Sequence, residues 1–131
     1  MPQSDDGQVQ YEVELISQGY RPRKVSRDEL PKVYAELPQR ESPTVSWGDI
    51  SEGGVVIVQV ADDYSVTTLG VDGTFYWLLE IDDDEEVMID LGGTDSMVPK
   101  GALAPRDRGL EVLLAVDDLA ALRTEYIWAE Q

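Results

Sequence analysis

The chain has 131 residues, with 27 acidic and 10 basic side chains and a formal net charge of −17. It contains neither cysteine nor histidine, which excludes disulfides, thiol nucleophiles, cysteine-ligated zinc and a Ser-His-Asp triad. The negative charge disfavours nucleic acid as a ligand, because nucleic-acid binders carry basic patches, and it favours cationic partners.

The length predicts one domain, which we place at 8–131 after a disordered lead-in over 1–7. No stretch reaches the ~20 apolar residues of a membrane helix. The first residues lack the basic and apolar regions of a secretory signal. We therefore expect a cytoplasmic protein that does not bind membranes, and the sequence leaves its oligomeric state open.

The first predicted strand lies within 8–16, where apolar and polar residues alternate strictly. Val9, Tyr11, Val13 and Leu15 fall on one face, so the strand should be buried on that face and wet on the other. A turn or loop is expected over 19–24.

A helix is predicted after this loop. Ser26 and Glu29 have the spacing of a capping box, and apolar residues follow at helical spacing. Pro31 disfavours helical geometry at Leu30, so we expect the helix to start only at Pro31, unless Pro31 kinks it. Pro38 should end it, and a strand is predicted within 43–50.

The stretch 54–81 predicts three consecutive strands and forms the centre of the expected sheet. Residues 55–60 are mostly β-branched, as in a strand buried on both faces. A second strand covers 64–69 and a third covers 74–81. Asp72-Gly73 between them predicts a type I′ hairpin turn, which needs positive φ at both central residues.

The remaining elements complete an α+β fold. Residues 87–91 predict a strand that Gly92-Gly93 ends. A helix is expected from Pro105, and a phase slip near 116–118 indicates a kink or two helices. A short strand should close the chain within 125–130. The prediction is a mostly antiparallel sheet of five to seven strands, with its central meander at 54–81, covered on one side by two helices.

Charge is segregated along the sequence. Residues 41–99 contain fourteen acids and no lysine or arginine. Six of the ten bases lie between 21 and 40. Such asymmetry indicates an electrostatic partner surface.

Two acidic loops are the candidate partner-binding site. In an antiparallel meander, the loop 82–86 returns to the end of the sheet at which the 61–63 turn lies. Together they would form an acidic rim, made of Asp62, Asp63, Asp82, Asp83, Asp84, Glu85 and Glu86. Tyr64 would add a nearby aromatic contact. The alternative is that these acids are solvated loop residues that only maintain solubility.

The sequence assigns no catalytic, metal or cofactor site. Five consecutive acids cannot all point at one ion, and the spacing of an EF-hand loop is absent from 82–86. A hydrolase that works with two carboxylates remains possible in principle. Nothing in the sequence selects such a pair from the 27 acids.

Residues 110–128 form an amphipathic helical stretch followed by a short break, a β-type residue and Trp128 near the chain end. In this pattern the chain resembles the first-numbered immunity-protein family of bacterial polymorphic toxin systems. Trp128 would occupy the family's near-terminal tryptophan position. Tyr64-Ser65-Val66 and Gly70 are similar to its Tyr/Ser/Gly-bearing central strand.

The resemblance implies a cytoplasmic antidote that binds a toxin domain one to one and occludes its active site. The toxins of such systems often attack nucleic acid, deaminases and nucleases among them. Such a toxin needs a cationic cleft, which an acidic protein can fill. The alternative is an acidic DNA mimic or polyanionic regulator, which would bind several unrelated basic proteins and lose them at high salt.

Overall fold

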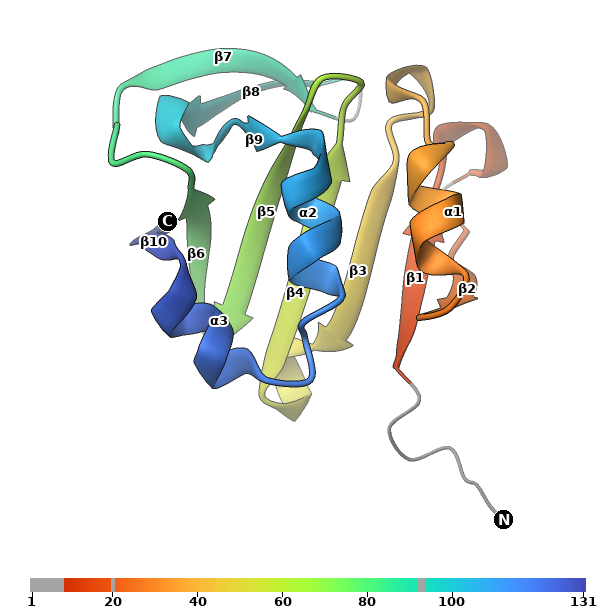
Figure 1. Cartoon of the computed structure of the whole chain (residues 1–131). Coiled ribbons are helices and arrows are strands. Elements are labelled where there is room, and N and C mark those ends of the chain that lie inside the picture. The colour runs from red at the N-terminus through yellow and green to blue at the C-terminus, as the bar shows by residue number, and fades with distance from the viewer. Residues whose placement is uncertain (1–8, 20, 92–93) are drawn as a thin grey trace.

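The computed structural model describes residues 9–19, 21–91 and 94–131 (Figure 1). The predicted lead-in at 1–7 and the break at Gly92-Gly93 lie outside the described residues. The strands are β1 (Gln10–Glu14), β2 (Arg23–Ser26), β3 (Thr44–Asp49), β4 (Gly54–Val60), β5 (Tyr64–Val71), β6 (Thr74–Leu79), β7 (Glu86–Leu91), β8 (Thr94–Pro99), β9 (Ala104–Pro105) and β10 (Ile127–Glu130). The helices are α1 (Leu30–Ala35), α2 (Arg106–Leu113) and α3 (Leu119–Glu125).

The fold is α+β with an antiparallel main sheet, as predicted. Its strands run in the order β10-β6-β5-β4-β3-β1-β2, and β9 pairs with β5 beside this path. Strands β7 and β8 form a separate hairpin that lies across one end of the sheet, and the three helices lie on the same face of the sheet (Figure 1). None of the described helices is long and apolar enough to cross a membrane.

Three helices replace the two predicted because the C-terminal helical stretch is broken. Helix α2 ends at Leu113, and Asp118 caps the start of α3. The carboxylate of Asp118 accepts a 3.0 Å hydrogen bond from the backbone amide of Ala121, which satisfies a free donor of the first turn. The phase slip in the apolar pattern therefore marks a boundary between two helices.

The predicted meander is confirmed as β4, β5 and β6, although β6 ends two residues before the predicted end at 81, and Ile57 and Gln59 leave one face of β4 only half-buried. Asp72 and Gly73 have φ values of 53° and 82°, the positive pair that a type I′ turn requires. Strand β4 lies between β3 and β5, and its residues Val56 and Val58 are fully buried. Together with Leu69 of β5 they face the helices and form the centre of the core.

The predicted loop at 19–24 is wrong in its last two residues, which begin β2. Arg23–Ser26 pairs antiparallel with β1, with Lys24 opposite Glu12. Val25 is the buried apolar residue of this short strand, so alternation could not reveal it. Ser26 and Glu29 do exchange the hydrogen bonds of a capping box. The box closes the turn between β2 and α1. The helix begins at Leu30, so the predicted start at Pro31 is wrong by one residue.

Candidate partner-binding surface

The turn between β4 and β5 holds the first two acids of the predicted rim in a fixed position. The carboxylate of Asp62 accepts a 2.9 Å hydrogen bond from the backbone amide of Gln39, whose side chain accepts one from the Asp62 amide. The guanidinium of Arg106 donates to the carbonyl of Ala61 at 2.6 Å. Asp63 is exposed and Tyr64 is half-buried. The turn therefore presents its acids from a braced backbone.

The loop 82–86 is also braced. The backbone amide of Gly101 donates to the carbonyl of Asp83 at 2.9 Å, and that of Lys100 donates to the carbonyl of Glu85 at 2.6 Å. A Cβ atom at Gly101 would lie 2.1 Å from the carbonyl oxygen of Ile81, so only glycine allows this approach. The exposed acids of the loop are Asp82, Asp84 and Glu85, and exposed Glu86 begins β7.

Asp83 differs from the other acids of the loop. Its carboxylate accepts a 3.0 Å hydrogen bond from the backbone amide of Glu85, and its side chain is half-buried. It therefore shapes the loop in addition to contributing charge, whereas its neighbours Asp82 and Asp84 are free to face a partner.

The structure places both acidic loops at the same end of the sheet, with the segment 100–105 between them. The start of this segment bonds to the loop 82–86, and β9 at its end pairs with Tyr64 and Ser65. Exposed Lys100 adds one base to the rim. Sequence reasoning missed this insertion because a strand of two residues, Ala104–Pro105, carries no alternation.

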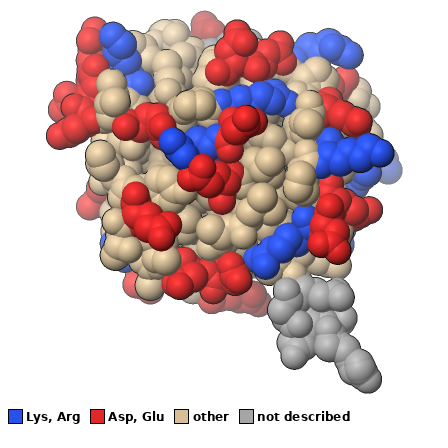
Figure 2. All heavy atoms as spheres, in the orientation of Figure 1, with Lys and Arg blue, Asp and Glu red and all other residues tan. Residues whose placement is uncertain are grey.

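Bases and acids are intermixed on the helical face of the molecule, as Figure 2 shows. Three arginines of the C-terminal region are engaged on this side. Arg106 lies over the ring of Tyr34, and Arg123 lies 5.3 Å from the ring centre of Tyr76. Arg108 pairs with Glu80. Arg108 therefore neutralises one acid of the segment 41–99, whereas Arg106 and Arg123 are held against aromatic rings.

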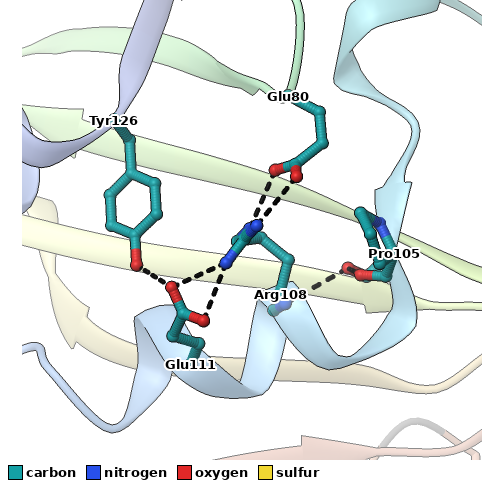
Figure 3. A network of polar contacts seen from close by, with 7 residues as sticks. Glu80, Pro105, Arg108, Glu111 and Tyr126 are labelled. Carbon is teal, nitrogen blue, oxygen red and sulfur yellow. Dashed lines mark hydrogen bonds and ion pairs between the residues drawn. The ribbon is translucent and has the colours of Figure 1, made fainter.

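Arg108 stands at the centre of a polar network between β6, α2 and the end of α3 (Figure 3). It donates two hydrogen bonds to the carboxylate of Glu80, at 2.8 and 2.9 Å, and two to that of Glu111, at 2.7 and 2.8 Å. The hydroxyl of Tyr126 donates to Glu111. Sequence reasoning could not pair these residues, because Glu80 and Arg108 are 28 positions apart.

This network gives the hydrolase alternative no support. An acid catalyst needs a raised carboxyl pKa, whereas hydrogen bonds from Arg108 lower the pKa of Glu80. Burial and the bond to Glu111 raise the pKa of Tyr126 to about 12, so its hydroxyl stays protonated. The arrangement is that of a tie between secondary-structure elements. Among the described residues, no group of three or more acids is arranged to hold a metal ion.

Acidification is expected to weaken the pair of Glu80 and Arg108. The pKa of Glu80 lies below its usual value of 4.5 because hydrogen bonds from Arg108 stabilise the carboxylate. The pair's contribution is therefore complete above about pH 4.5 and is lost as the pH falls below it through the lowered pKa. We expect Glu80→Gln to lower the free energy of unfolding by about 1 kcal/mol at pH 7 and by less at about pH 3.

Urea unfolding of wild type and variant at both pH values measures this difference. Glu80→Gln also removes one negative charge and with it part of the repulsion among the acids, so a variant that loses a charge elsewhere is needed for comparison. Glu36→Gln is the control, because Glu36 is exposed and shares none of these hydrogen bonds. A difference between wild type and Glu80→Gln that stays constant with pH would contradict the assignment.

The three tryptophans are half-buried. The indole of Trp128 donates a 3.0 Å hydrogen bond to the carbonyl of Leu122, which fastens β10 to α3. Trp128 also packs edge-on against Tyr126. Its position in the structure is thus set by contacts within the C-terminal region. No family model, curated protein or solved structure matches this chain.

Proposed function

We propose that the chain is an immunity protein that binds a cognate toxin domain one to one and occludes its active site. The observation that carries the proposal is the segregation of charge. Residues 41–99 contain no lysine or arginine and supply β3 to β8 with the turns between them. The resemblance of 110–128 and Trp128 to the first-numbered immunity family points in the same direction.

The partner we propose has a cationic cleft. A toxin domain that acts on nucleic acid must attract phosphate, so its active site carries lysine and arginine. The braced, exposed acids of the turn at Asp62-Asp63 and of the loop 82–86 would attract the same side chains. Charge complementarity of this kind raises the association rate and selects the partner.

The proposed role is stoichiometric binding in the cytoplasm. We assign the chain no catalytic residue, metal or cofactor of its own, and nucleic acid is not the ligand. Under this proposal, the acidic loops act on the toxin by covering its cleft, and the polar network around Arg108 only stabilises the fold.

The test is a pull-down from the native host with the tagged chain, washed first at low and then at high salt. We expect one stoichiometric partner to survive the high-salt wash, because a dedicated interface excludes water and salt from its centre. Many basic proteins that are retained at low salt and lost at high salt would instead favour the DNA-mimic alternative. Retention of no partner would contradict both functions.

A further inference from the structure

The face of the main sheet that the helices leave uncovered has an apolar half. Val56 and Leu69 face the helices, so their sequence neighbours in the strands point to the opposite, open face. One row of paired residues across this face reads Ala129, Trp77, Thr68, Ile57, Ser46 and Glu12. The row is mostly apolar over β10, β6, β5 and β4 and becomes polar over β3 and β1.

The apolar half is exposed only in part, because Val55, Val66 and Leu79 on the same face are buried. Phe75 and Ile127 are 38% and 49% exposed, while Trp77 and Ile57 are half-buried. Phe75 lies opposite Gly70, which has no side chain to cover it. The solvated face of an antiparallel sheet normally carries polar residues. A group of exposed aromatic and aliphatic side chains on such a face indicates an interaction surface.

The charges around this apolar half are mainly negative, although exposed Lys100 lies at the end of the sheet that carries Asp62 and Asp63. Exposed acids stand at both ends of the central strands: Asp49, Glu52 and Asp72 at one end, Asp62 and Asp63 at the other. On the open face of the described sheet, the strand register places one base, Lys24. It lies opposite Glu12, near the edge of the sheet farthest from the apolar half. A partner must therefore combine apolar side chains with surrounding positive charge.

We propose that the apolar half of the open face docks a basic protein domain. Apolar side chains of that domain cover Phe75, Trp77 and Ile127, and its lysines and arginines face the acids at the strand ends. The inference rests on the proposed function, whose toxin domain is the partner, and it names the surface that the partner covers. Nucleic acid and anionic membranes would be repelled by these acids. A second copy of the chain would be repelled too, because it carries the same net charge of −17.

The experiment places the photo-crosslinker p-benzoylphenylalanine at position 75 or 127 of the full chain in the native host. Position 124 is the control, because exposed Thr124 lies on α3. We expect crosslinks from 75 and 127 to one basic protein and none from 124. With that protein purified, Phe75→Ser should weaken binding by about 30-fold, as expected for an aromatic hot spot. Ile16→Ser, which changes an exposed apolar residue at the other edge of the sheet, should leave binding unchanged.

Each contrary outcome has a separate meaning. Crosslinks between two copies of the chain, to an acidic protein, or from position 124 alone would overturn the docking surface. So would no crosslink from 75 or 127 while the pull-down retains its partner, an outcome that leaves the proposed function standing. A crosslinked basic protein that is harmless to cells would leave the surface standing and overturn the proposed function. Unfolding curves of Phe75→Ser check that lost binding does not reflect lost folding.

Discussion

Gly109→Val is expected to lower the free energy of unfolding by about 3 kcal/mol, the upper part of the range for overpacked cores. A Cβ atom at this position would lie 2.5 Å from a methyl carbon of Val58 and 2.6 Å from the hydroxyl oxygen of Tyr34. Helix α2 would have to move away from β4. The movement would also strain the 3.2 Å hydrogen bond from the Gly109 amide to the hydroxyl of Ser65.

Glycine within a helix normally costs about 1 kcal/mol relative to alanine. At position 109, the presence of glycine in the helix is explained by the close approach of α2 to the sheet. Ala120→Val is the matched control, because Ala120 is exposed on α3. Valine there should lower the free energy of unfolding only through its lower helix propensity, by at most about 0.7 kcal/mol. Urea unfolding followed by circular dichroism compares the two. Equal small effects would show that α2 does not approach β4 this closely.

Reversing charge at the loop 82–86 is expected to weaken binding to the salt-resistant partner by about 100-fold. Close charge pairs across an interface are worth about 1.5–7 kcal/mol each, and 100-fold corresponds to about 2.7 kcal/mol. Asp82→Lys combined with Asp84→Lys changes two exposed acids. Asp83 is kept, because its carboxylate holds the amide of Glu85. Titration calorimetry with the purified partner measures the loss.

The control for this reversal combines Glu36→Lys with Glu125→Lys. Both residues are exposed at the C-terminal ends of helices α1 and α3, where lysine is favoured by the helix dipole. The two double variants change the net charge equally. We expect the control to keep nearly full affinity. Equal losses in both would mean that net charge alone drives binding, and unchanged affinity in the loop variant would remove the loop from the mechanism.

Much of the fold could be predicted from local signals. The Asp72-Gly73 turn and the β-branched run in β4 each determine their structure within a few residues. The strands β2, β8 and β9 were not predicted, and β2 and β9 could not be, because two to four residues carry no period and pair only through tertiary contacts. The contacts of Arg106 could not be predicted either, because they too are tertiary. Its guanidinium also donates to the carbonyls of Tyr34 and Leu37 across α1.

The acidic loops of the candidate site were visible in the sequence because charge is read directly from composition. Their spatial relation was predicted only in part. The meander places both at one end of the sheet, but the insertion of 100–105 between them depends on the fit of Gly101 against Ile81. The exposed apolar half of the open face was also missed. Alternation in β6 separates Phe75 and Trp77 from Tyr76, but it cannot say which face the helices cover.

The most direct test of the account is growth of bacteria that express the salt-resistant partner, with and without this chain. An immunity protein predicts that the partner alone arrests growth. Co-expression of the chain should restore growth, and co-expression of Asp82→Lys/Asp84→Lys should restore it less. A partner that is harmless by itself, or one whose toxicity persists although the complex forms, would contradict the proposed function.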